Sequence, residues 1–546
     1  MTLVREANII VKDHRKMDLK VVIAYPSTYR AAISTLSIHM LYYYLNSYEN
    51  VVAERTVLDL GRISTSYISL ESKIPIKKYD MILFSVHYEL DYINIVDILY
   101  NSGIPLYSKS RGGKDPIIII GGPTVTANPE PLAELADIIV IGEMEQPLET
   151  IVNEYLSSHS KRDFLDRLVG KEGFYIPSYG RHYVRKSWVK DSTLKSAITP
   201  IEQIQPLEEK YYPIYGRAYL IEISRGCGFG CRFCLLDYIS RPPRYKDYKL
   251  ILNSISEGII RNNVDKVVLV SSSPLSHPKA KLILKYIVDE LQLQLSIPSL
   301  RADTLDEEVL HLIHRGGQKT LTLAPEVAVD KLRMALNKKI PNTLFFNVVK
   351  CAWNTGFRKL KLYFLFNVPG ETKNDLNAIP KVISKLAKIG YNYTGAIHVT
   401  LNPLIPKAQT PLQWMPLPSL EEIRYKSKYL KSILRSNIVK LDILNPKLSY
   451  IQMVLSLGDR NTLKLITKWF TYGKGLSGWS RALREEGTLV KNIIKRRLDE
   501  PLPWDHIDLG LGKEYLKIEW DLYSKCETTP PCTTGCSRCK LCGELG

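Results

Sequence analysis

The stretch "SRGCGFGCRFC", residues 224–234, decides how the rest of this sequence is organised. Three of the chain's nine cysteines, Cys227, Cys231 and Cys234, fall within eight positions and are interleaved with three glycines. On a helix these cysteines would share one face and could form a buried stripe. Each glycine costs a helix roughly 1 kcal/mol relative to alanine, however, so three of them favour a loop. The sequence therefore predicts a loop that bends its thiols towards a common ligand.

The residues around this loop predict a partial barrel. Apolar, strand-like stretches alternate with amphipathic helical ones, such as 305–315 and 373–389. The expected strands are 218–224, 266–273, 293–301, 319–326, 359–370 and 395–406. Strand–helix units of this kind predict a partial (β/α)6 barrel of the TIM type. The cysteine loop follows the first strand, and the active sites of such barrels lie where the strands end.

The N-terminal part of the chain predicts an α/β domain with a doubly wound parallel sheet, because buried strands alternate with helices. The expected strands are 19–26, 79–87, 115–123 and 136–143, and the expected helices lie around 30–46, 91–101 and 145–157. Gly121, Gly122 and Gly142 follow strand ends. Such sheets bind ligands there, although glycine at a strand end also simply permits a tight turn.

A chain of 546 residues is too long for one ordinary core, and its pattern divides it into five parts. We expect a Rossmann-like domain at 1–165, a linker at 166–214 and the barrel at 215–415. A mainly helical domain at 416–525 and a cysteine-rich metal-binding tail at 526–546 follow.

Composition is that of a soluble globular protein, with 45% hydrophobic and 24% charged residues. No apolar run approaches the roughly 18 residues of a membrane span, so we expect no transmembrane segment. The first sixteen residues lack the apolar centre of a signal peptide, and we expect a cytoplasmic protein. The net charge of +18 suits RNA or an anionic lipid surface, but dispersed lysines without such a partner give the same value.

Three neighbouring thiolates suit an iron–sulfur cluster or a zinc ion. A four-iron cluster held only by protein takes four cysteines, so three would leave one iron open to a substrate or cofactor. Zinc would need a fourth ligand such as histidine. The nearest histidine downstream is His277, which belongs to a different strand–helix unit.

The C-x3-C-x2-C spacing, with the aromatic Phe233 before the third cysteine, resembles the signature of radical S-adenosylmethionine (SAM) enzymes. The resemblance implies a [4Fe-4S] cluster on Cys227, Cys231 and Cys234, with SAM bound to the open iron. One electron, supplied by a donor of the flavodoxin or ferredoxin type, would split SAM into methionine and a 5′-deoxyadenosyl radical. That radical would then take a hydrogen atom from the substrate.

The same resemblance implies further contacts to SAM. Where the family often has a Gly-Gly-Glu run for the methionine amino group, "SSSPLSHP" (271–278) offers Ser272 and Ser273. In "TLAPE" (322–326), Glu326 is placed like the family's acidic group near the ribose hydroxyls. In "NVPGET" (367–372), Pro369 and Gly370 resemble a strand-end motif near the adenine, although Pro-Gly also forms plain turns.

Over almost the whole chain, the sequence resembles radical SAM proteins with an N-terminal cobalamin-binding-like domain. "LIPKAQTPLQW" (404–414), "LSLGDR" (455–460) and "PWDHIDLG" (503–510) contribute to this resemblance. Many cobalamin domains carry a D-x-H-x-x-G loop whose histidine coordinates cobalt, and the N-terminal part lacks that motif. Either cobalamin binds here without a protein histidine, or the fold persists without cobalamin.

The tail holds five further cysteines, of which Cys526 is spaced more loosely than the others. Cys532, Cys536, Cys539 and Cys542 predict a second metal centre, either an iron–sulfur cluster or structural zinc. Metal binding would explain how a tail without hydrophobic periodicity becomes ordered.

The resemblance implies an enzyme that modifies an unactivated carbon by methyl transfer or by rearrangement, with methyl transfer first. Methylthiolation or sulfur insertion on tRNA, using the second cluster, is the main alternative. Modification of a lipid is a third option that the basic charge tolerates. A non-catalytic iron–sulfur protein that binds RNA or senses redox state is the alternative from another class.

Overall fold

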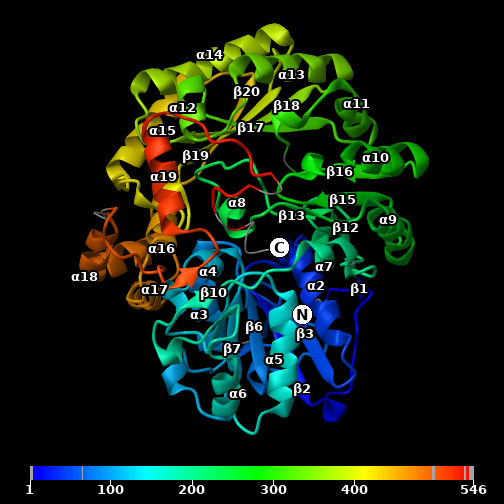
Figure 1. Ribbon diagram of the computed structural model, residues 1–546, viewed down its shortest axis with the longest axis vertical. Helices are drawn as coiled ribbons and strands as arrows, with labels where there is room; N and C mark the ends of the chain where they lie inside the picture. Colours follow the sequence, from blue (N-terminus) through cyan, green and yellow to red (C-terminus); the bar gives the residue numbers. More distant parts are fainter. Residues whose placement is uncertain are drawn as a thin grey trace.

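The computed structural model describes residues 4–63, 66–197, 199–298, 300–494, 498–533, 536–539 and 541. Two α/β units lie at opposite ends of the long axis, the N-terminal one in blue and cyan and the second in green and yellow (Figure 1). The C-terminal helices run along one side and contact both units.

The N-terminal unit is a doubly wound sheet, as the sequence predicts. Its strand order is β3-β2-β6-β7-β8-β9, in which the first five strands are parallel and β9 is antiparallel. The strands are β2 (Leu19–Tyr25), β3 (Val51–Val57), β6 (Met81–Ser85), β7 (Ile117–Gly121), β8 (Ile138–Val140) and β9 (Phe174–Tyr175). Its helices include α2 (Leu36–Asn46), α3 (Tyr92–Asn101) and α5 (Glu145–Ser157). Residues from both faces of the sheet belong to hydrophobic clusters, which explains the nearly continuous apolar strands.

Strand β3 was not predicted, because buried charges interrupt its apolar pattern. Its sequence is VVAERTV, and both Glu54 and Arg55 are buried. The Arg55 guanidinium lies 2.7 Å from a carboxylate oxygen of Glu6 and 2.6 Å from one of Glu71. Paired in this way, a charged side chain can occupy a buried strand.

The second unit is a partial barrel made of two parallel sheets, which a bridge between Leu300 and Leu323 joins in the described part of the chain. The first sheet holds β12 (Tyr219–Glu222), β15 (Lys266–Val270) and β16 (Gln294–Ser296). The second holds β17 (Thr320–Glu326), β18 (Lys359–Phe366), β19 (Ile397–Pro403) and β20 (Val439–Ile443). The intervening helices include α9 (Tyr248–Asn262), α11 (Glu307–Arg315), α13 (Asn342–Thr355) and α14 (Lys373–Ile389).

All six predicted barrel strands are present, and β20 is an additional seventh strand. It forms the edge of its sheet, pairs only with β19 among the described residues, and its residues are alternately half-buried and exposed. The short alternating pattern VKLDI lacks the apolar run that identified the other strands.

The C-terminal part is mainly helical beyond β20, with α15 (Leu420–Ile433) just before that strand. The later helices are α16 (Pro446–Ser456), α17 (Thr462–Thr471), α18 (Leu476–Ile494) and α19 (Lys513–Ser524). None of the helices in the described ranges is long and apolar enough to span a membrane.

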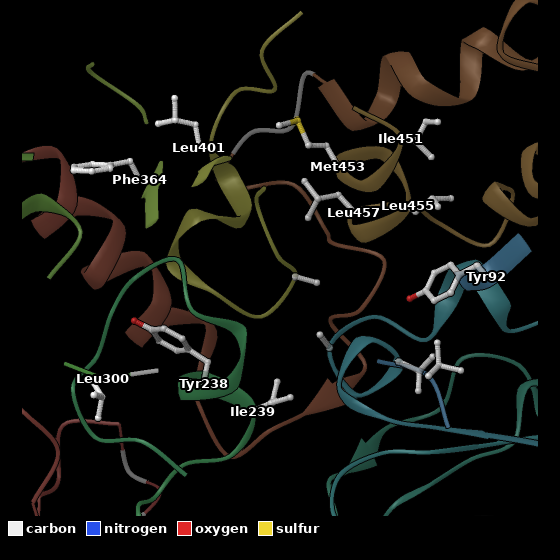
Figure 2. Packing of buried hydrophobic residues seen from close by; sticks show 14 of the residues in the cluster. Tyr92, Tyr238, Ile239, Leu300, Phe364, Leu401, Ile451, Met453, Leu455 and Leu457 are labelled. Atoms are coloured by element: carbon white, nitrogen blue, oxygen red, sulfur yellow. The ribbon is translucent and has the colours of Figure 1, made fainter. Parts of the chain in front are cut away.

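One hydrophobic cluster joins the units to each other. Figure 2 shows Tyr92 of α3, Ile239 of α8 (Leu235–Ile239), Phe364 of β18 and Ile451 of α16 within it. The N-terminal sheet, the barrel and the C-terminal helices therefore share one core. This core fixes the position of the two units relative to each other.

The segment expected to be a linker is built into the fold by strand pairing. Strand β10 (Val184–Arg185) pairs in parallel with β21 (Ile507–Asp508), and β11 (Gln205–Pro206) pairs with β1 (Glu6–Ala7). Residues of "PWDHIDLG" thus bind the N-terminal unit, and His506 Nε2 lies 3.6 Å from the buried carboxylate of Glu130.

Candidate active site

The cysteine loop lies at the carboxyl end of the first barrel strand. Strand β12 is followed by β13 (Ser224–Arg225), which pairs with β14 (Arg244–Tyr245), and helix α8 begins directly after Cys234. Gly226 and Gly230 have φ values of 82° and 74°, which residues with a side chain rarely adopt. A Cβ on Gly226 would lie 2.4 Å from the Ser240 carbonyl oxygen. The glycines are needed to bend the loop, as the sequence predicts.

The three thiols of the loop are close enough to influence one another. Cys231 is buried, and Cys227 and Cys234 are half-buried; all three are free thiols. Burial raises the pKa of each, and with the nearby Asp237 and Cys231 it raises that of Cys234 to about 12. Such thiols stay protonated unless a metal displaces the proton.

A zinc ion fits this loop poorly. Zinc would need a fourth ligand beside the three thiols. His277 is engaged, because its Nε2 lies 2.9 Å from the Lys246 carbonyl oxygen and its Nδ1 accepts from the Lys279 amide. His277 is therefore not available as the fourth ligand of a zinc ion.

Arg301 completes the loop's surroundings and was not predicted as a site residue. Its Nη1 lies 3.5 Å from Cys231 Sγ, and its guanidinium lies 3.6 Å from the centre of the Phe229 ring. Asp303 fixes it through a 2.7 Å ion pair. A basic residue at the end of the third predicted strand was the signal that the sequence offered.

Glu326 lies at the carboxyl end of β17, near the loop. It is 8% exposed, and Lys338 Nζ donates a hydrogen bond to its Oε1 at 2.6 Å. Its φ of 65° is unusual for a residue with a side chain. Such conformations are costly and occur preferentially at functional sites.

The other predicted contacts surround the loop to different degrees. Phe233 packs against an apolar cluster that contains Val327, Val368 and Leu404, which follow three successive barrel strands. Tyr523 of α19 belongs to the same cluster, and its hydroxyl donates to the Pro369 carbonyl at 2.6 Å. The loop is thereby brought to the ends of the later strands.

Three further residues predicted to contact SAM are Gly370, Ser272 and Ser273. Gly370 is exposed at a turn with a φ of 78°. Ser272 is exposed as well, and the Oγ of the buried Ser273 lies 2.7 Å from that of Ser276. Ser271, which was not predicted, lines a cavity between the two α/β units. Its Oγ lies 2.6 Å from Ser224 Oγ.

A cavity of about 590 Å³ lies between the two α/β units, beside the stem of the loop. The N-terminal sheet contributes Gly121, Gly122 and Gly142 from its carboxyl edge. The barrel contributes apolar side chains of its first strands, which are Leu220, Val268 and Val270, and α8 contributes Leu236 and Ile239. A Cβ on Gly122 would lie 2.2 Å from the Val86 carbonyl oxygen, so this glycine also permits a close turn.

A charged network lines the cavity beside the loop stem. The Arg225 guanidinium lies 2.8 to 3.0 Å from the carboxylates of Glu143, Glu145 and Glu222. Burial alone would raise the pKa of Glu222, but Arg225 and Lys246 hold it at about 2. The network joins the N-terminal unit, which supplies Glu143 and Glu145, to the start of the barrel.

The tail cysteines lie on the other side of the loop. Cys532, Cys536 and Cys539 line one small void together with Gly230 of the loop. Cys526 packs at the edge of the apolar cluster around Phe233. Cys542 lies outside the described residues.

Comparison with known proteins identifies the family. The model for radical SAM proteins, N-terminal, matches residues 37–177, and the model for the radical SAM superfamily matches residues 221–382. Together they span more than half of the chain, and the second includes the cysteine loop. The chain belongs to the radical SAM superfamily.

Two proteins have amino-acid sequences similar to that of this chain. The uncharacterized protein MJ0966 of Methanocaldococcus jannaschii is 28% identical over 498 residues, which are 90% of this chain and 100% of that protein. Bacteriochlorophyllide d C-8(2)-methyltransferase of Chlorobaculum tepidum is 25% identical over 144 residues, 26% of this chain and 27% of that protein.

Two solved structures of radical SAM enzymes are similar to this chain. The cobalamin-dependent SAM radical enzyme OxsB has a TM-score of 0.50 at 14% identity and covers 93% of this chain and 80% of its own. The radical SAM methyltransferase TsrM from Kitasatospora setae has a TM-score of 0.48 at 15% identity, covering 70% of this chain and 75% of its own. At these identities the likeness concerns the fold.

As a radical SAM protein, the chain is an enzyme whose family cofactors are a [4Fe-4S] cluster and SAM. Its loop fits a cluster with one open iron, because it offers three free thiols and positive charge from Arg301 beside Cys231. A thiolate-bound cluster carries net negative charge, which a buried cation stabilises.

Proposed function

We propose that this radical SAM enzyme transfers a methyl group to an unactivated carbon of its substrate. The observation that carries the proposal is the cavity between the carboxyl edge of the N-terminal sheet and the first barrel strands. It adjoins the stem of the cysteine loop through Arg225 and α8, so a reacting group held there would lie beside the loop.

Cys227, Cys231 and Cys234 would hold the [4Fe-4S] cluster, which when reduced supplies the electron that splits SAM into methionine and a 5′-deoxyadenosyl radical. Arg301 would stabilise the negative charge around Cys231. Glu326, held by Lys338, would accept hydrogen bonds from the ribose hydroxyls. Phe233 and Pro369 lie at the strand ends where the adenosine would pack, whereas Ser272, Ser273 and Gly370 would contribute through their backbones.

The cavity suits cobalamin as the methyl carrier. The sheet order reverses between β2 and β6, and ligands of doubly wound sheets bind at the carboxyl edge beside such a reversal. Gly121 and Gly122 carry no side chains into the cavity at that edge, and mainly apolar residues form the opposite wall. His87, which follows β6, lines the same cavity. The fold shared with OxsB, which is cobalamin-dependent, supports this assignment.

Lipid and RNA are the two substrate classes to test, because the net charge of +18 suits either of them. Sulfur transfer to tRNA is less well supported, because the tail cysteines line a separate void. Leu236 and Ile239 of α8 face the cavity, whereas Arg241, just after α8, lines the void of the tail.

The proposal is tested by anaerobic turnover with SAM that carries a deuterated methyl group, a one-electron reductant, cobalamin, and copurified lipid or RNA. Methyl transfer yields S-adenosylhomocysteine together with 5′-deoxyadenosine, and the labelled methyl group appears in the substrate fraction by mass spectrometry. A non-catalytic iron–sulfur protein would give none of these products. Incorporation of sulfur instead of the methyl group would favour methylthiolation.

Glu326→Gln is expected to weaken SAM binding about 10- to 100-fold, because hydrogen bonds to a charged group contribute about 1.5–3 kcal/mol. Iron content should stay unchanged, since Glu326 is not a cluster ligand. The measurement is a SAM titration of the reconstituted protein. Glu514→Gln, at a glutamate whose side chain is 79% exposed, is the matched control. Wild-type affinity in Glu326→Gln would remove this residue from the site.

Gly121→Leu is expected to weaken cobalamin binding about 10-fold or more by filling the cavity. A Cβ at Gly121 would meet Val140 at 3.7 Å, an ordinary contact, so the backbone should accept the change. Binding is followed by the absorbance of hydroxocobalamin. Gly113→Leu, at an exposed turn with no neighbour within 4 Å, is the control. Equal affinity of both variants would place cobalamin elsewhere.

A further inference from the structure

Two helices on the outside of the barrel, α14 and α15, pack against each other and each carry a row of cations. The cations of α14 are Lys381, Lys385 and Lys388, and those of α15 are Arg424, Lys428 and Lys431. The spacing i, i+4, i+7 puts each row on one side of its helix. Figure 1 shows α14 at the end of the molecule away from the N-terminal unit. We call these six side chains the basic face.

The charge of the basic face is not neutralised within the described part of the chain. None of its six cations forms an ion pair with a carboxylate there, whereas Lys426, elsewhere on α15, lies 3.2 Å from Glu371 and 3.0 Å from Glu422. Five of the six are exposed, and Arg424 is half-buried. Like charges at i and i+4 destabilise a helix. A bound polyanion would remove this repulsion.

The cations of α10 (Ala280–Lys285) show the contrast on another outer helix of the barrel. Lys281 Nζ lies 2.7 Å from Asp306, and Lys285 Nζ lies 2.7 Å from Glu308. Both lysines are about as exposed as a surface residue can be while paired, at 47% and 46% of the side chain. Their charge is therefore balanced by the protein itself, unlike that of the basic face.

Two tyrosines lie among the cations of α15. The rings of Tyr425 and Tyr429 are nearly parallel, at 8°, with their centres 6.4 Å apart. Tyr425 is 63% exposed, whereas the Tyr429 hydroxyl donates to Asn377 Oδ1 of α14 at 2.5 Å. Lys373 Nζ lies 5.1 Å from the centre of the Tyr429 ring. An exposed ring beside unpaired cations offers a nucleic-acid base a surface for stacking.

The tyrosines lie close to a turn of the candidate active site. Asn367, at the end of β18, donates to Glu422 Oε1 of α15 at 3.1 Å. Pro369 and Gly370 follow in the same turn, and α14 begins at Lys373. The basic face thus extends outwards from a strand end of the barrel.

We propose that the basic face and Tyr425 bind a single-stranded segment of RNA, and that RNA is the substrate of this enzyme. The cations match the phosphates of the backbone, and the exposed ring matches a base. An anionic membrane would also match the cations, but membrane-surface helices insert large apolar side chains. Of the large hydrophobic side chains that the described parts of α14 and α15 expose, none is aliphatic. The role of RNA as substrate rests on the proposed methyl transfer; the binding surface does not.

The double variant K428Q/K431Q tests the charges, with fluorescence anisotropy of labelled oligoadenylate as the measurement. Its affinity should fall at least about 10-fold at low salt, and the slope of log affinity against log salt should fall by about 1.4, since each phosphate contact on a single strand contributes about 0.7. K281Q/K285Q removes the same charge from α10 and should bind like the wild type. Equal affinity of the two double variants, or no binding by the wild type, would overturn the proposal.

Tyr425→Leu tests the stacking separately from the charge. Its affinity for oligoadenylate should fall about 10-fold with an unchanged salt slope, because stacking on one base contributes about this much and involves no ion release. Tyr100→Leu, at a tyrosine of α3 that is 61% exposed, is the matched control. Wild-type affinity in Tyr425→Leu would overturn RNA as the partner, because charge alone would then explain the binding.

Sedimentation with vesicles of phosphatidylglycerol and phosphatidylcholine tests the membrane alternative. We expect the wild type to stay in the supernatant under the conditions in which it binds oligoadenylate. Sedimentation of the wild type, lost in K428Q/K431Q, would overturn RNA in favour of a membrane. None of these binding measurements uses SAM, a reductant or cobalamin, so failure of the methyl-transfer proposal would be distinguishable.

The substrate role is tested by turnover with deuterated SAM and copurified RNA. The labelled methyl group should appear in the RNA, and at low RNA concentration K428Q/K431Q should incorporate at least about 10-fold less of it than K281Q/K285Q, in line with its weaker binding. Both variants should cleave SAM equally without RNA. Label in copurified lipid but not in RNA would overturn RNA as the substrate.

Discussion

Cys231→Ala is expected to abolish formation of 5′-deoxyadenosine, because loss of one of three thiolates leaves the cluster with too few ligands. Iron content should fall by about four per chain. The measurement is chromatography of products after anaerobic incubation with dithionite and SAM. Cys227→Ala and Cys234→Ala should behave in the same way.

The fold should survive this change, because Cys231 lies in a loop and is not a member of the shared hydrophobic cluster. Cys351→Ala is the matched control: it removes a half-buried thiol from α13 and should retain both iron and activity. Full cleavage of SAM by any of the three loop variants would contradict the assignment of the cluster.

Arg232→Ala is expected to destabilise the loop and the tail by about 3–5 kcal/mol, since it leaves the buried Glu519 carboxylate without its ion-pair partner. Both side chains are at most 1% exposed. We expect a lower midpoint of thermal unfolding and faster proteolysis of the C-terminal segment.

A double variant separates the lost ion pair from lost packing. Arg232→Met combined with Glu519→Leu removes both charges, and replacing a buried ion pair by apolar residues is often neutral. The double variant should therefore unfold at a higher temperature than Arg232→Ala. An Arg232→Ala protein with wild-type stability would show that the ion pair does not stabilise this part of the chain.

The barrel and the N-terminal sheet could be predicted from sequence because most of their strands are apolar runs between helical stretches. Strand β3 escaped this reasoning, since Glu54 and Arg55 are buried through partners distant in sequence. The edge strand β20 was not predicted, because its residues are alternately half-buried and exposed and form no apolar run.

The cysteine loop was predictable because its ligands and glycines are contiguous, so local spacing carries the information. Arg301, Lys338 and the anchored tail were not, because their roles arise from contacts between segments far apart in the chain. Arg301 is seventy residues from Cys231, and Cys532, whose amide donates to the Gly228 carbonyl, is more than three hundred residues from Gly228. No local pattern encodes such encounters.

The most direct test of the account is one anaerobic reaction of reconstituted protein with reductant, cobalamin, copurified lipid or RNA, and SAM, analysed for two products. We predict that 5′-deoxyadenosine and S-adenosylhomocysteine both accumulate with the wild type, and that 5′-deoxyadenosine is absent with Cys231→Ala. Absence of 5′-deoxyadenosine from the wild type, at full iron content, would contradict radical SAM catalysis by this chain.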